Sequence, residues 1–105
     1  MTNLETIQSL QNKFGEFKYE LNDNKEVITI TIDNKGVKSE DLKLIGELTN
    51  LKGLYLPNNQ IDTIQDLEKL IHLKVVNFSS NQIPDSQIEE LKKQFKTKDR
   101  ELIVI

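Results

Sequence analysis

The chain has 105 residues, a formal net charge of −3 and 36% apolar residues, 26 of which are Leu or Ile. A chain of this length forms one domain that buries about two-thirds of its unfolded surface, and the aliphatic content is too high for a disordered protein. The lack of Cys excludes disulfide scaffolds and cysteine-ligated zinc, the single His excludes a multi-histidine metal site, and no apolar run approaches a membrane span.

The first predicted element is a helix over residues 3–14. Thr2 and Glu5 form a capping box at its start, and Gly15 stops it. Its apolar face is predicted to contain Leu4, Ile7, Leu10 and Phe14. We expect this helix to close the N-terminal end of the fold, because a terminal unit needs a polar outer surface.

A hairpin follows the helix. Residues 17–21 alternate between apolar and charged, an NDNK turn comes next, and the run VITITI is predicted to turn Ile28, Ile30 and Ile32 toward the core. The alternation does not decide whether residues 16–21 join the main sheet or fold over its end.

An internal repeat organises the rest of the chain. Five positions recur 22 residues apart, and the pairs are Leu51 and Leu73, Leu54 and Val76, Leu56 and Phe78, Asn59 and Asn81, and Ile61 and Ile83. The same template fits 24 residues earlier on Val27, Ile30, Ile32, Lys35 and Val37. A degenerate copy 27 residues after the second one turns Ile103 and Ile105 inward.

Three segments connect the repeated positions. The first is a helix capped by Ser39 that carries Leu42, Ile45 and Leu48 inward. In the second, residues 62–70, apolar residues at every third position favour tight 3₁₀-like turns.

The third connecting segment is a helix that begins with a capping box of Ser86 and Glu89 and turns Ile88, Leu91 and Phe95 inward. The chain ends on the apolar strand ELIVI. No linker or second domain is visible, and we expect the chain to be complete.

The repeated pattern L-x-x-L-x-L-x-x-N-x-I, which is LKGLYLPNNQI at residues 51–61 and LKVVNFSSNQI at residues 73–83, resembles the leucine-rich repeat. The opening segment is similar to the entry of small bacterial proteins of this family. The resemblance covers residues 27–105 and implies an α/β fold, namely a short solenoid with a parallel concave sheet. Its expected parts are a helix and hairpin cap (1–26), three leucine-rich coils (27–99) and a closing strand (100–105), all in a single domain.

Two repeated asparagines, Asn59 and Asn81, are predicted to be structural. They follow the strands, where the chain turns and leaves backbone groups unpaired, so their amides are suited to tie neighbouring coils together. The alternative is that both are ordinary turn residues. Lys35 occupies the matching position of the first coil and cannot accept such bonds, so Asn34 is the candidate to replace it.

The predicted strands lie near residues 27–32, 53–57, 75–79 and 101–105, and their exposed face is the candidate binding site. The face is expected to present Thr29, Thr31, Asp33, Gly53, Tyr55, Pro57, Val75, Asn77, Ser79, Leu102 and Val104. In leucine-rich repeat proteins this concave face is the usual place for a partner. The resemblance therefore implies non-enzymatic binding of a partner protein, with Tyr55 and Asn77 central, no cofactor and no metal. The alternative to binding is a solvated face.

Other functions have weaker support in the sequence. The apolar edge at residues 102–105 is suited to add a strand from a partner or from a second copy, so the chain is expected to be a monomer or a weak homodimer. The alternative is that Arg100, Glu101 and the terminal carboxylate protect this edge. A small immunity or antitoxin-like inhibitor of a partner protein is a further alternative. His72 has no catalytic neighbours, and the basic run at residues 92–100 reads as a solvated helix end rather than a phosphate site. We expect a cytoplasmic, bacterial protein without enzymatic activity and without a nucleic-acid or membrane partner.

Overall fold

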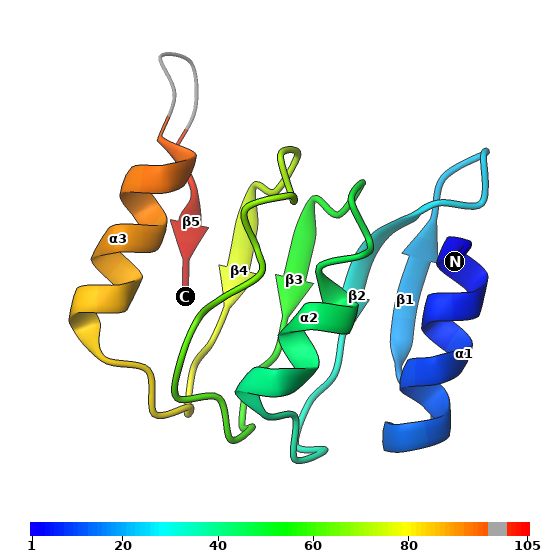
Figure 1. Cartoon of the computed structure of the whole chain (residues 1–105), viewed down its shortest axis with the longest axis horizontal. Coiled ribbons are helices and arrows are strands. Elements are labelled where there is room, and N and C mark those ends of the chain that lie inside the picture. Colours follow the sequence, from blue (N-terminus) through cyan, green and yellow to red (C-terminus); the bar gives the residue numbers. More distant parts are fainter. Residues whose placement is uncertain (97–100) are drawn as a thin grey trace.

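The protein is a mixed α/β structure built on one five-stranded sheet, in a computed structural model that describes residues 1–96 and 101–105. The elements are α1 (Asn3–Phe14), β1 (Lys18–Leu21), β2 (Val27–Thr31), the 3₁₀ turn η1 (Ser39–Asp41), α2 (Leu42–Ile45), β3 (Gly53–Tyr55), β4 (Val75–Asn77), α3 (Asp85–Phe95) and β5 (Ile103–Val104). The strands lie side by side in chain order (Figure 1). β1 is antiparallel to β2, and the other three neighbouring pairs are parallel.

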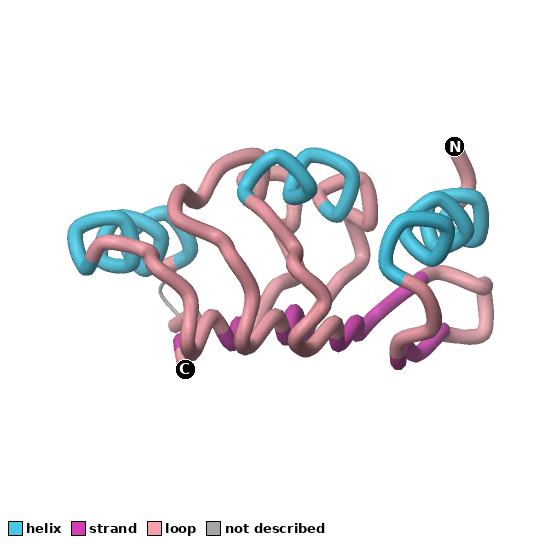
Figure 2. Tube along the Cα trace, turned by 90° about the horizontal axis from the view of Figure 1, so that it is seen from below, coloured by secondary structure: helices cyan, strands magenta, loops and turns pink. Residues whose placement is uncertain are grey.

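The helices lie on one side of the sheet, and none of the described residues forms a helix on the other side (Figure 2). The sheet therefore has one face against the core and one face open to solvent. We call the second one the open face, and its residues are given below.

The N-terminal hairpin joins the main sheet, which answers the question that its alternation left open. Tyr19 of β1 lies opposite Ile30 of β2, and the pairing register shifts between Glu20 and Leu21. Because Leu21 lies opposite Val27, Ile28 is left without an opposite residue. Ile28 is only half-buried for this reason, whereas Val27, Ile30 and Ile32 are fully buried.

Helix α1 has the predicted bounds and the predicted capping box. The Thr2 hydroxyl accepts from the Glu5 N–H at 3.1 Å, and the Glu5 carboxylate accepts from the Thr2 N–H at 2.8 Å. The prediction for Leu4 is wrong, since its side chain is 42% exposed. Helix α1 packs through Ile7 and Leu10, and Thr6 takes the remaining buried position.

The capping box of α1 predicts a pH dependence. The hydrogen bonds from Thr2 lower the pKa of Glu5 below its ordinary value of 4.5. Because the pKa of Glu5 is lower in the folded state than in the unfolded state, the charged carboxylate stabilises the protein above pH 4.5. This contribution is lost as the pH falls through the folded pKa. We expect Glu5→Gln to lower the melting temperature at pH 7 and to have a smaller effect at pH 2.5, as measured by circular dichroism. An equal effect at both pH values would contradict the charged cap.

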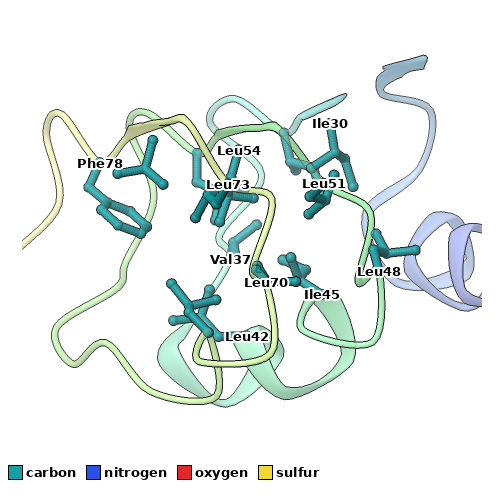
Figure 3. Packing of buried hydrophobic residues seen from close by; sticks show 14 of the residues in the cluster. Ile30, Val37, Leu42, Ile45, Leu48, Leu51, Leu54, Leu70, Leu73 and Phe78 are labelled. Carbon is teal, nitrogen blue, oxygen red and sulfur yellow. The ribbon is translucent and has the colours of Figure 1, made fainter. Parts of the chain in front are cut away.

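The repeated apolar positions form the core. Leu51, Leu54, Leu56 and Leu73 are fully buried, and the exposed fraction of Phe78 is 5%. Figure 3 shows Leu51, Leu54 and Leu73 packed with side chains of the first coil. Each buried Leu contributes about 2 kcal/mol by leaving water, so the repeat accounts for much of the driving force for folding.

The connecting segments of the first two coils differ in part from the prediction. The N–H of Lys38 donates to Asp41 at the start of η1, so Ser39 does not cap its own helix. The Ser39 hydroxyl instead donates to the Asp62 carboxylate at 2.7 Å and accepts from the Asp62 N–H at 3.1 Å, which joins two coils and lowers the pKa of Asp62. Residues 62–70 contain one tight turn of the predicted 3₁₀-like kind, in which the Leu70 N–H donates to the Leu67 carbonyl at 3.0 Å. Most of the other residues of this segment have no regular structure.

Helix α3 begins two residues earlier than its predicted capping box requires. Pro84 is the N-cap residue and makes no side-chain hydrogen bond, which places Ser86 inside the helix. Leu91 and Phe95 are buried as predicted, and Ile88 is half-buried. The last four residues of the predicted basic run, 97–100, lie outside the described residues, as does the first residue of the predicted closing strand.

An ion pair between Lys13 and Asp41, which the sequence analysis did not predict, joins α1 to the first coil. The Asp41 carboxylate is buried, accepts from the Lys38 N–H at 2.8 Å, and accepts a further hydrogen bond from the Lys13 ammonium. The same contact raises the pKa of Lys13 above its ordinary value. The N-terminal helix is therefore fixed to the sheet by a polar contact as well as by apolar packing.

Candidate functional site

The open face consists of two rows of side chains that cross the strands. Strand register places Glu20, Thr29, Gly53, Val75 and Ile103 in the first row. The second row contains Lys18, Thr31, Tyr55 and Asn77. Ile105 continues this second row, because its N–H donates to the Val76 carbonyl and its carbonyl accepts from the Phe78 N–H, both at 2.9 Å.

The prediction for β5 is wrong by one residue. Val75 lies opposite Ile103 and Val76 lies opposite Val104, so Leu102 and Val104 point toward the core. Leu102 is 6% exposed and Val104 is half-buried, whereas Ile103 is 61% and Ile105 is 59% exposed. Side chains alternate along a strand, so a slip of one residue exchanges the two faces. Ile103 and Ile105 thus replace Leu102 and Val104 on the open face.

Tyr55 lies at the centre of the open face and folds over Gly53. A Cβ atom placed on Gly53 would lie 2.8 Å from Cε2 of Tyr55 and 3.1 Å from its hydroxyl oxygen. The missing side chain of Gly53 thus provides the space that the ring occupies. The sequence predicted Tyr55 on this face but not its contact with Gly53.

Polar contacts are concentrated on the β1–β2 side and at the strand ends. The Thr29 hydroxyl donates to the Glu20 carboxylate at 3.0 Å, and the Ser79 hydroxyl donates to the side-chain Oδ1 of Asn77 at 2.7 Å. Asp33 accepts a hydrogen bond from the Asn58 amide at 3.0 Å. Apolar side chains gather on the other side, over β3 to β5, and they are Tyr55, Val75, Ile103 and Ile105.

Asn59 and Asn81 connect successive coils through their amides. Asn59 Oδ1 accepts from the N–H groups of Lys35 and Val37 at 3.1 and 3.0 Å, and its Nδ2 donates to the Ile32 carbonyl at 2.7 Å. Asn81 Oδ1 accepts from the Ile61 N–H at 2.9 Å. Nδ2 of Asn81 donates to the Leu56 carbonyl at 2.8 Å. Each Asn therefore bonds backbone groups of the coil that precedes it.

This direction explains why the first coil carries Lys35 instead of Asn. The element before the first coil is the antiparallel strand β1, which has no turn of the same kind to receive an amide. Asn34 does not replace the missing amide but occupies a left-handed backbone position, with φ of 55°. Asn58 and Ser80 take the same conformation at the matching positions of the next two coils, with φ of 58° and 56°.

Neither a metal site nor a membrane span is found in the described part of the chain. Over residues 1–96 and 101–105, no three His, Asp or Glu side chains are grouped closely enough to hold a metal ion. None of the helices within those ranges is both long and apolar enough to cross a bilayer. His72 is exposed at the junction of two coils.

Comparison with known proteins finds one family. Residues 49–93 match the family model for leucine-rich repeats, in two copies. This part of the chain consists of leucine-rich repeats. No match to a curated protein was found, and none to a solved structure. Leucine-rich repeat domains generally mediate protein–protein interaction and are typically non-enzymatic.

The matched residues cover the two best-preserved leucine-rich repeat copies and most of α3. The first coil lies before them, and its strand β2 continues the same parallel sheet. Of the predicted face residues, Thr29, Thr31, Tyr55, Val75 and Asn77 lie in the two rows, and Asp33, Pro57 and Ser79 follow at the strand ends.

Sequence reasoning missed four residues of the open face. Lys18 and Glu20 alternate with apolar residues, and this signal predicts them once β1 is placed in the sheet. Ile103 and Ile105 carry no comparable signal, because they stand in a run of four apolar residues.

Proposed function

We propose that this chain is a short leucine-rich repeat solenoid that binds a partner protein through the concave, open face of its sheet. The observation that carries the proposal is the apolar side of that face. Ile103 and Ile105 are 61% and 59% exposed; Ile103 lies beside Val75, and Ile105 lies beside Asn77, whose other neighbour in the row is Tyr55. Exposed apolar side chains that are grouped and bordered by polar ones are typical of protein-binding surfaces.

The size of the face limits the kind of complex. Five strands about 4.8 Å apart span roughly 19 Å, whereas a standard interface buries roughly 800 Å² on each partner. The partner must therefore also contact the strand ends, where Asp33, Pro57 and Ser79 lie. Tyr55 is the proposed anchor, since Tyr is enriched among residues that dominate binding energy.

The test is capture of a partner from lysate of the source organism, followed by titration calorimetry with the captured protein. The double variant Tyr55→Glu, Asn77→Arg and the single variant Ile103→Glu are both expected to weaken binding at least tenfold. The matched control is Lys43→Glu, Glu47→Lys, which reverses two exposed charges at α2 on the helical side and keeps the net charge. The control is expected to bind like the wild type.

Retained binding in the face variants would contradict the proposal and direct attention to the strand edges. Melting temperatures separate this outcome from misfolding, because surface substitutions leave the free energy of unfolding within about 0.5 kcal/mol. A tight complex of fixed stoichiometry that blocks the partner's activity would favour the immunity or antitoxin-like reading. A bacterial origin and a cytoplasmic location belong to the same proposal, and the Lys- and Ile-rich composition without Cys supports them.

A further inference from the structure

A second surface lies at the end of the sheet, between α3 and the outer edge of β5. A hollow there is lined by Glu89, Lys92, Lys93, Lys96, Glu101 and Leu102. Helix α3 lies further out than β5 in both views, on the core side of the sheet (Figures 1 and 2). The helix therefore overhangs the position that a sixth strand would occupy.

The backbone at this edge is unpaired. Ile103 and Ile105 donate to the carbonyls of Lys74 and Val76 in the direction of β4, both at 2.9 Å. Successive residues of a strand point their N–H and C=O groups in opposite directions, so those of Val104 point away from β4. Within residues 1–96 and 101–105 they have no hydrogen-bond partner. Proteins usually protect such an edge with charges or irregular pairing.

The opposite edge of the sheet has this protection. Strand β1 carries Lys18 and Glu20 as well as the register shift against β2. On β5 the outward side chains are the exposed Ile103 and Ile105. The two edges of the sheet thus differ, because the outward side chains of β5 itself are apolar and the charges of this segment, Glu101 and the terminal carboxylate, lie at the ends of the strand.

The hollow is positively charged. Three ammonium groups of α3 face two carboxylates, and the ion pairs Lys92–Glu89 and Lys96–Glu101 are long, at 3.6 and 4.0 Å. All four partners are exposed, and exposed pairs of this kind contribute little. Lys93 forms no ion pair with any of the described residues.

We propose that this hollow takes an extended, acidic segment of a partner protein, which pairs with β5 as a sixth strand beneath α3. Alternate side chains of a strand point to opposite faces, so the segment has acidic residues toward the lysines of α3. The residues between them are apolar and lie beside Ile103 and Ile105. A second copy of this chain is a poor occupant, because two-fold pairing of β5 edges brings both α3 helices to the same side and into the same space.

This proposal shares with the proposed function only the assumption that the ligand is a protein. The hollow is a different site from the open face. The probe is a fluorescent seven-residue peptide in which Val and Glu alternate, titrated with the full chain by fluorescence polarisation. The control peptides have Lys in place of Glu, or the same composition in scrambled order. Both controls are expected to bind at least tenfold more weakly, and added salt is expected to weaken binding of the Val and Glu peptide.

Val104→Pro removes the outward N–H without removing a hydrogen bond to β4, and Val104→Ala is its matched control for lost packing. We expect the Pro variant to weaken peptide binding at least tenfold relative to the Ala variant. Tyr55→Glu is expected to leave peptide binding unchanged, which separates failure at this site from failure at the open face.

Amide hydrogen exchange of the wild type gives a measurement that does not depend on folding of the Pro variant. The Val104 N–H is expected to exchange at least tenfold more slowly when the peptide is bound. Unchanged exchange at Val104, equal binding of the Lys peptide, or no binding of the Val and Glu peptide at 1 mM would each overturn the proposal.

Discussion

Replacing Asn59 with Ala is expected to lower the free energy of unfolding by about 3 kcal/mol. The side chain is 5% exposed, and its amide satisfies the N–H groups of Lys35 and Val37 and the carbonyl of Ile32. Each buried backbone group left without a partner costs about 1–3 kcal/mol. Ala can supply neither a donor nor an acceptor, and the first coil loses the contacts that close its turn. Urea unfolding followed by circular dichroism measures the change.

The matched controls for Asn59 are the two equivalent positions. Lys35→Asn is expected to have almost no effect, because no coil precedes the first one to receive the new amide. The loss of unfolding free energy for Asn81→Ala is expected to lie between those for Asn59→Ala and Lys35→Asn, because Asn81 makes similar hydrogen bonds but is half-buried. Equal losses of stability for Asn59→Ala and Lys35→Asn would show that the amide contacts do not stabilise the fold.

Gly46→Ala is expected to destabilise the protein by about 2–3 kcal/mol, in contrast to the usual effect of this substitution. Gly46 has φ of −64°, which Ala adopts readily, and Ala has the higher helix propensity. A Cβ atom on Gly46, however, would lie 2.2 Å from the carbonyl oxygen of Asp66 and 3.1 Å from that of Leu42. Both atoms belong to the backbone, so two coils must move apart, and forced overpacking costs about 1–3 kcal/mol.

Gly15→Ala separates this steric effect from backbone strain. Gly15 has φ of 78°, and a Cβ atom there would meet nothing within 4 Å. Its replacement therefore costs only backbone strain, because φ of 78° with ψ of −163° is a conformation that is essentially restricted to Gly, and such strain costs about 1–3 kcal/mol. Thermal unfolding of the wild type, the Gly46→Ala variant and the Gly15→Ala variant ranks the three proteins by melting temperature. A Gly46→Ala variant that is more stable than the wild type would contradict the close approach of the coils.

The repeat made the parallel part of the fold predictable. Leu and Asn at fixed spacing predict which residues point toward the core and where each coil turns. The structure accordingly buries Leu51, Leu54, Leu73 and Val76. The helix bounds of α1 were equally clear, because its capping box and Gly15 are local signals. The connecting segments were harder, since Ser39 and Ser86 satisfy local capping rules while tertiary contacts decide their roles.

The open face was predictable where polar and apolar residues alternate, as around Tyr55. It was not predictable at β5, because Leu102, Ile103, Val104 and Ile105 are all apolar and give no preference for either register. Packing decides instead, since Leu102 belongs to the same buried cluster as Leu91 and Phe95 of α3. The ion pair of Lys13 with Asp41 joins residues 28 positions apart and has no local signature.

The amides of Asn59 and Asn81 also determine the order in which the turns of the coils can form during protein synthesis. Protein synthesis delivers the chain from its N-terminus, and each coil receives its amide from the coil that follows. A growing chain cannot close the turn at Val37 until Asn59 has left the ribosome, and the turn at Ile61 waits for Asn81 in the same way. The first two coils are therefore each completed by the coil that follows, and removing the chain from Asn81 onward is expected to open the turn at Ile61.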